Sequence, residues 1–130
     1  MVHLLKDPDG WISVLKLSNM WEMEKIRELA IDKLTSIRMI PVEKIVLAKE
    51  YHVPQWLRSG YQELVDRGEM PTTEEARKIS FESATGIFQI RESTMRGRNY
   101  GNGSTFTVEG VFEAELVVEE RWQKDHFTPS

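Results

Sequence analysis

The sequence predicts an all-α fold, with five helices in residues 1–92 and one further helix close to the C-terminus. Three observations lead to this prediction. Apolar residues recur every three or four positions along most of the chain, which is the spacing of one helix face. Prolines and hydroxyl or acidic residues interrupt that spacing where helices usually begin. The chain of 130 residues contains no cysteine, so neither disulfide bonds nor thiolate-bound metal can hold the fold together.

The first two predicted helices are marked by their N-termini. Asp7-Pro8 supplies an N-cap followed by a proline at the first helical position. Asn19, with Glu22 three residues later, has the spacing of a capping box, in which each residue's side chain bonds the other's backbone amide. The second helix is therefore expected to start directly after Asn19 and to continue to Leu34.

Prolines and a second capping box divide the next three helices. Ile40-Pro41 opens the third helix, and Pro54 limits it, because a proline disfavours helical geometry in the residue before it. Pro54 itself can occupy the first turn of the fourth helix. Thr72 and Glu75 have the spacing of a capping box. The fifth helix is expected to run from there to Ile90 without interruption.

The pattern changes after residue 92. Residues 93–106 are rich in Gly, Asn and Arg and have no apolar periodicity, which predicts a flexible linker. Residues 107–125 then predict an acidic amphipathic helix, and residues 126–130 a tail. Apolar residues also alternate between Phe106 and Val118, as they do in a strand, so a strand is the alternative. The abundance of glutamate and the unpaired edges of a lone strand favour the helix.

Apolar side chains on the inner faces of these helices are expected to form the core. Several of them are large rings at helix starts or junctions, where a ring can close a corner of the core. The expected core residues are Trp11, Leu15, Trp21, Ile26, Ala30, Leu34, Ile45, Trp56, Leu57, Tyr61, Leu64, Ile79 and Ile87.

The titratable residues show no pattern typical of catalysis or metal binding. The three histidines are scattered along the chain, whereas zinc ligands usually come in closely spaced pairs. Paired glutamates recur, but acid–base catalysis requires a cleft that separates their pKa values. We therefore expect no catalytic residue, no cofactor and no metal site. No apolar run is long enough to span a bilayer, and no signal peptide is evident, so the expected location is the cytoplasm or nucleus.

The net charge of −4 argues against a nucleic-acid-binding domain, which is usually basic. One segment nevertheless provides an alternative function. Arg91, Arg96 and Arg98 lie close to Tyr100, and cations beside an aromatic ring are typical of segments that bind single-stranded nucleic acid. Three cations would give only weak binding that is lost in salt. A nucleic-acid-associated regulator is therefore the second hypothesis.

The C-terminal segment is expected to bind a partner protein or a second copy of the chain. Its apolar stripe contains Phe112 and Leu116, and Trp122 follows the acidic stretch directly after Arg121. Tryptophan and arginine are frequent anchors of protein interfaces. The candidate partner-binding residues are therefore Phe112, Leu116, Arg121 and Trp122, although Trp122 could equally close the core.

Several motifs together resemble one known family. They lie in residues 11–34, which contain Trp11, Trp21 and Arg27, and in residues 45–48, 51–57, 60–64, 67, 73–76, 91–92 and, more loosely, 108–116. The sequence resembles the helical region that follows the BTB/POZ fold in fungal, especially basidiomycete-type, BTB-domain proteins. The fold that this resemblance implies is a five-helix, BACK-like bundle with a last acidic helix.

The resemblance also implies a non-enzymatic function. Proteins of this family are commonly dimers, and some are adaptors for cullin-type ubiquitin ligases or regulators of transcription. The residues before Trp11 are too few to form the BTB fold, so dimerisation and cullin binding through that fold are not carried over. The expected function is that of an adaptor or scaffold domain that binds other proteins.

Overall fold

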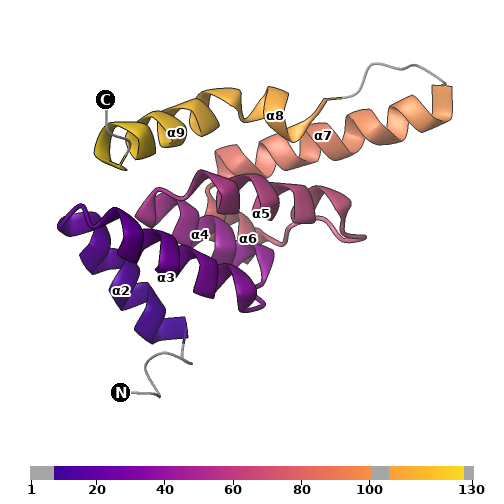
Figure 1. Ribbon diagram of the computed structural model, residues 1–130. Helices are drawn as coiled ribbons and strands as arrows, with labels where there is room; N and C mark the ends of the chain where they lie inside the picture. Colours follow the sequence, from indigo (N-terminus) through magenta and orange to yellow (C-terminus); the bar gives the residue numbers. More distant parts are fainter. Residues whose placement is uncertain (1–7, 101–105, 128–130) are drawn as a thin grey trace. The chain divides into compact units, whose positions relative to one another are not determined.

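The computed structural model describes residues 8–100 and 106–127, except for the side chains of 97–100. Within this part of the chain all regular structure is helical, in eight helices labelled α2 to α9 (Figure 1). The prediction of an all-α protein is confirmed, and the segment that could have been a strand forms helices from Val108 onward. The expected N-cap Asp7 lies outside the described residues.

The described chain forms two compact units. Unit 1 contains the residues up to Met39 together with those from Arg121 onward, and unit 2 contains Ile40–Glu120. The last helix, α9 (Glu113–Phe127), contributes residues to both units. This division differs from the expected one, in which residues 1–92 form a single core, because the end of the chain belongs with the first two helices.

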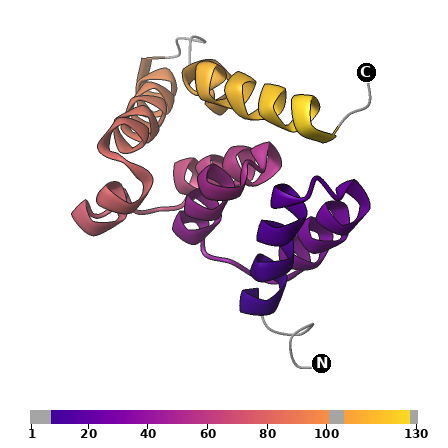
Figure 2. The ribbon, with the colours of Figure 1, turned by 90° about the vertical axis from the view of Figure 1, so that its left-hand side faces the viewer.

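Unit 1 is built on α2 (Pro8–Met20) and α3 (Glu24–Ser36), which lie side by side in both views of the ribbon (Figures 1 and 2). Trp11 and Leu15 on α2 are buried, as are Ala30 and Leu34 on α3. The helical spacing of these four residues gives each helix one apolar stripe. The two stripes together form most of the core of unit 1.

The predicted capping box at the start of α3 is wrong. Helix α2 continues through Asn19, Glu22 adopts the left-handed conformation with φ of 52°, and α3 starts only at Glu24. Met23 is the N-cap and makes no side-chain capping bond. The amide oxygen of Asn19 instead accepts a hydrogen bond of 2.8 Å from Nε of Arg27, so this side chain serves tertiary structure.

Two expected core residues are also on the surface. Trp21 is 71% exposed and Ile26 is 39% exposed. Trp21 follows the last residue of α2, and the late start of α3 brings Arg27 to the inward-facing position. Because successive residues of a helix differ by about 100°, Ile26 then points away from the core.

Unit 2 begins with the helix pair α4 (Pro41–Tyr51) and α5 (Pro54–Asp66). His52 ends α4 in the left-handed conformation, with φ of 61°. The helices approach closely at Gly60, where an added Cβ would lie 2.6 Å from Cγ1 of Ile45. Any larger residue at this position would force the Ile45 side chain to shift and would crowd the carbonyl of Pro41, 3.3 Å from the added Cβ.

The predicted fifth helix is two helices, α6 (Thr73–Ile79) and α7 (Phe81–Tyr100). Ser80 interrupts it with φ of 91°, and its hydroxyl accepts a hydrogen bond from the backbone amide of Ser83. Ser80 therefore caps α7, a role that serine commonly takes. The capping box of Thr72 and Glu75 is confirmed at the start of α6. Hydrogen bonds from Arg67, together with the Thr72 amide, lower the pKa of Glu75 to about 2.

Part of the predicted linker is helical as well. Helix α7 extends to Tyr100, so residues 93–100 of the predicted linker are helical, whereas residues 101–105 lie outside the described residues. The hydroxyls of Ser93 and Thr94 bond the carbonyl of Ile90, and Arg96 pairs with Glu92 one turn earlier. The ion pair favours helix where composition alone predicts a loop, and the two hydroxyl bonds are the form that Ser and Thr side chains take inside a helix.

The predicted C-terminal helix is divided at Phe112 into α8 (Val108–Val111) and α9, which continues through residues 126 and 127 of the expected tail. Helix α8 packs against α5 and α7. The ring of Phe112 lies over Gly86 of α7, where an added Cβ would be only 2.7 Å from the ring. Glycine at this position therefore provides the space for the Phe112 ring.

The other expected core residues are buried in the two units. They are Trp11, Leu15, Ala30, Leu34, Ile45, Trp56, Leu57, Tyr61, Leu64, Ile79 and Ile87. The structure adds Ile31, Val42, Val53, Ile90 and Val108 to this set.

Replacing each of two tryptophans by alanine should show which of them is buried, through the loss in the free energy of unfolding. Trp56→Ala removes a ring that is only 2% exposed and should lower the free energy of unfolding by about 3 to 5 kcal/mol. Trp21→Ala removes an exposed ring and should change it by only about 0.5 kcal/mol. Urea denaturation of both variants measures the difference. Equal losses would mean that Trp21 is a core residue.

Candidate protein-binding surface

Six exposed apolar side chains follow one another where α2 ends and α3 begins. We call this set the α2–α3 corner, and it consists of Leu17, Met20, Trp21, Met23, Ile26 and Leu29. Leu17 lies three residues before Met20 and four before Trp21. Met23, Ile26 and Leu29 are likewise three residues apart. Residues at these spacings lie on adjoining helical turns. Single exposed apolar residues are normal, but a group that includes tryptophan and two methionines is a candidate interaction surface.

The backbone explains why Trp21 is exposed. The buried stripe of α2 ends at Ser18, and no further helical turn follows Trp21. The amide of Trp21 donates to the carbonyl of Leu17, and the amide of Met23 donates to that of Ser18. These bonds close the turn between the helices (Figure 1). The Trp21 ring is therefore held outside the core by a defined backbone conformation.

Acidic residues predominate around the corner. Glu22, Glu24 and Glu28 are exposed, whereas Lys25 is the exposed basic residue of the same stretch. Helix α2 has no basic residue in its last turn, so the partial negative charge at its C-terminus adds to that of the carboxylates. An apolar partner segment flanked by lysine or arginine would complement this surface.

A buried arginine, Arg27, lies next to the α2–α3 corner and bonds two other helices of unit 1. Arg27 is 3% exposed, and its guanidinium donates to Asn19 on α2 at 2.8 Å and to Gln123 on α9 at 2.9 Å. It also lies over the ring of Phe127, 4.6 Å from the centroid. Burial lowers the pKa of Arg27 to about 10. Because a buried charge needs its hydrogen bonds, Arg27 fixes the mutual positions of these three helical segments within unit 1.

The structure does not bring the four predicted partner-binding residues together. Phe112 and Leu116 are buried in unit 2, so their assignment to a binding surface is wrong. Their burial follows from Gly86, which admits the Phe112 ring, and from Tyr61, on which this ring stacks at 3.8 Å. Arg121 is exposed, and the half-buried Trp122 stacks on His126 at 4.1 Å in unit 1.

Unit 2 contains a polar cluster that the sequence did not reveal. The hydroxyl of Tyr61 bonds Ser83 at 2.8 Å and Glu115 at 2.6 Å, and Nζ of Lys49 donates to Ser83 at 2.9 Å. Burial of the phenol raises the pKa of Tyr61, and the hydrogen bond to Glu115 raises it further. Serine beside lysine can form a catalytic pair when the amine accepts the serine proton. Here Nζ also donates to the carbonyl of Ile79 at 2.6 Å and lies 3.5 Å from a carboxylate oxygen of Glu115, so Lys49 links α4 to α6, α7 and α9.

The same face of α9 is bound by two further groups of unit 2. Nδ1 of His52 lies 2.8 Å from a carboxylate oxygen of Glu119. Arg58 on α5 donates to the carboxylates of Glu109 and Glu120. Three acidic residues of the segment that was predicted as an acidic helix, Glu109, Glu119 and Glu120, therefore pair with His52 at the end of α4 and with Arg58 of α5.

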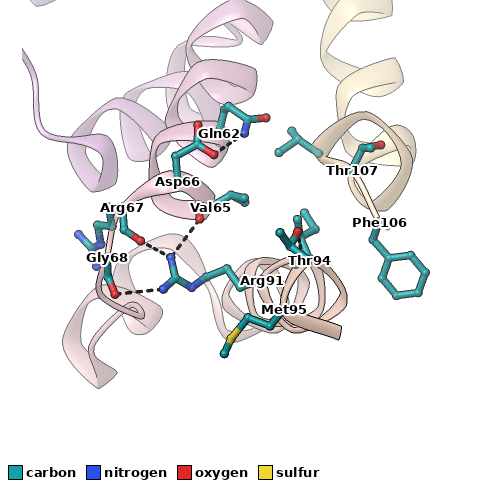
Figure 3. A pocket seen from close by; sticks show the side chains of 12 residues that line it. Gln62, Val65, Asp66, Arg67, Gly68, Arg91, Thr94, Met95, Phe106 and Thr107 are labelled. Carbon is teal, nitrogen blue, oxygen red and sulfur yellow. Dashed lines mark hydrogen bonds between the residues drawn. The ribbon is translucent and has the colours of Figure 1, made fainter. Parts of the chain in front are cut away.

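A cavity of about 490 Å³ between α5, α7 and the start of α8 is closed at one end by Arg91 (Figure 3). The guanidinium of Arg91 donates to the carbonyls of Leu64, Val65, Arg67 and Gly68. Carbonyls at the end of a helix lack partners within it, so Arg91 completes the C-terminus of α5.

This role bears on the second hypothesis, in which arginines around Tyr100 bind nucleic acid. Arg91 is committed to backbone carbonyls, and Arg96 pairs with Glu92. The side chains of Arg98 and Tyr100 lie outside the described residues. The described geometry therefore adds no support to a nucleic-acid interface.

Among the described side chains, no three histidine, aspartate or glutamate residues gather closely enough to hold a metal ion. No helix in residues 8–100 or 106–127 combines the length and apolar character needed to cross a membrane. Comparisons with models of protein families, with curated proteins and with solved structures give no match. The function therefore has to be argued from the residues of the chain itself.

Replacing Tyr61 by phenylalanine tests the polar cluster. Tyr61→Phe removes both bonds of the hydroxyl and should lower the free energy of unfolding at neutral pH by about 1 to 3 kcal/mol. The raised pKa of Tyr61 stabilises the folded state fully below pH 10, the ordinary pKa of tyrosine, and this contribution is lost as the pH rises further.

The difference between wild type and Tyr61→Phe should therefore shrink above pH 10. Urea denaturation of both proteins at neutral and alkaline pH gives this comparison. A difference that stays constant with pH would show that the Tyr61 hydroxyl is solvated and not buried.

Proposed function

We propose that the chain is a non-enzymatic protein-binding domain, an adaptor or scaffold whose α2–α3 corner binds an apolar helical segment of another protein. The observation that carries this proposal is the exposure of Trp21, which stands beside Met20 (67% exposed) and Met23. Trp21 lies on the surface of a unit whose core already holds Trp11.

The chemistry of the corner suits such a partner. Tryptophan is enriched among the few residues that dominate interface energy, and its truncation often costs about 2 kcal/mol or more. Methionine side chains are flexible and adapt to different apolar surfaces. The acidic residues Glu22, Glu24 and Glu28 around them favour a segment whose apolar positions are flanked by basic residues.

The resemblance to the BACK-like region of fungal BTB-domain proteins supports the adaptor role, since the related proteins bind other proteins without catalysis. On this basis we place the domain in the cytoplasm or nucleus. The resemblance does not identify the binding surface, because its motifs include both the exposed Trp21 and the buried Arg27. The proposed surface rests on the exposure of the side chains.

A displayed library of helical peptides provides a direct test. Each peptide carries the same apolar positions, and the flanking positions are randomised between basic, neutral and acidic residues. Selection on the full chain should enrich peptides with basic flanks. Trp21→Ser should weaken binding of the selected peptides at least about tenfold. The matched control Phe106→Ser changes an exposed aromatic residue shortly before α8 and should leave binding unchanged.

Circular dichroism of both variants verifies that the helices remain folded. Enrichment without regard to flanking charge, or equal binding by wild type and Trp21→Ser, would contradict the proposal.

A further inference from the structure

Helix α7 has a second exposed apolar surface, separate from the α2–α3 corner. Its inner face holds Ser83, Ile87 and Ile90, which are buried. On its outer face Phe81 is 60% exposed, Phe88 51% and Met95 63%. Residues of this kind on a 20-residue helix are not explained by the packing of unit 2.

The three apolar residues are spaced by seven. Because seven residues make just under two turns, positions seven apart lie almost in line along a helix, with a drift of about 20°. Helices that pack along one another in coiled coils repeat with the same seven-residue period. Glu82, Gln89 and Arg96, each one position further on, form a second exposed line parallel to the first.

Both lines are complementary to themselves when two copies of α7 run antiparallel. A two-fold axis near the centre of the lines places Phe88 against Phe88 of the second copy and Phe81 against Met95. The same axis places Glu82 opposite Arg96 and Gln89 opposite Gln89. In a parallel arrangement the second lines of the two copies would lie on opposite sides of the helix pair and could not face each other.

We propose that the outer face of α7 binds a second copy of the chain in an antiparallel, two-fold symmetric dimer. A two-fold interface uses the same surface of both copies, as these lines require. Glu92 lies between the lines and already pairs with Arg96 of its own chain at 2.8 Å, so in the dimer Arg96 would bind two carboxylates. This assigns self-association to α7 and not to the C-terminal segment that the sequence suggested.

The contact is modest in size. One helix face on each side is at the lower end of the area that stable protein pairs bury. We therefore expect a dimer that dissociates in the micromolar range or above, at about 1 to 100 μM.

Charge reversal on the full chain tests the pairing. Glu82→Arg and Arg96→Glu each oppose like charges twice in the dimer and should each raise the dissociation constant at least about tenfold. The double variant restores opposite charges and should recover most of the affinity. Sedimentation velocity over a range of concentrations measures all four proteins. Phe88→Glu should give a monomer, and Trp21→Glu should dimerise as wild type.

Single cysteines give an independent reading, because the chain has none of its own. Gln89→Cys should form a disulfide with the second copy under mild oxidation. The control Glu43→Cys, exposed on α4, should form it much more slowly.

Three outcomes would overturn the proposal. The wild type could stay monomeric up to about 1 mM, the double charge reversal could fail to restore the affinity lost in the single variants, or Gln89→Cys could cross-link no faster than Glu43→Cys. Dissociation by Trp21→Glu and not by Phe88→Glu would place the dimer at the α2–α3 corner instead.

Discussion

Tyr61 buries its whole ring and its hydroxyl in unit 2, and this constraint determines how the surrounding helices can turn. A buried hydroxyl without a partner costs about 1 to 3 kcal/mol, so hydrogen-bonding groups have to be supplied from neighbouring helices. Ser83 on α7 and Glu115 on α9 supply them. The ring of Phe112 stacks on the ring of Tyr61, with 3.8 Å between the two centroids. The burial of Tyr61 therefore requires Ser83, Phe112 and Glu115 to face it.

The outer surfaces follow from this inward arrangement. With Ser83 and the residues in line with it facing inward, α7 has to present Phe88 and its neighbours to the outside. In unit 1, Arg27 takes an inward position in the same way, and the neighbouring Ile26 faces outward. Polar groups thus occupy places in the interior that apolar groups would ordinarily hold. Apolar side chains are consequently left on the outside, and these are the side chains on which the two binding proposals rest.

The sequence was sufficient for the helices and for most of the core, because periodicity and proline positions report on local structure. It was not sufficient for the buried polar residues. Nothing local shows that Asn19 bonds Arg27 and not the amides of the next helix, since that bond depends on tertiary packing. Trp21 and Trp56 both lie at predicted helix starts or junctions, yet only Trp56 is buried. The break at Ser80 likewise requires a positive φ that composition does not predict.

The central claim is that the α2–α3 corner is surface and not core, and that the outer face of α7 is covered only by association. Hydroxyl-radical footprinting with mass spectrometry measures this in the unaltered full chain, because methionine, tryptophan and phenylalanine all react rapidly when exposed. In dilute solution Trp21 and Met20 should be oxidised much faster than Trp56, as their exposures require. At high concentration Phe88 should become protected while Trp21 stays reactive. A Trp21 as protected as Trp56 in the dilute chain would contradict the account.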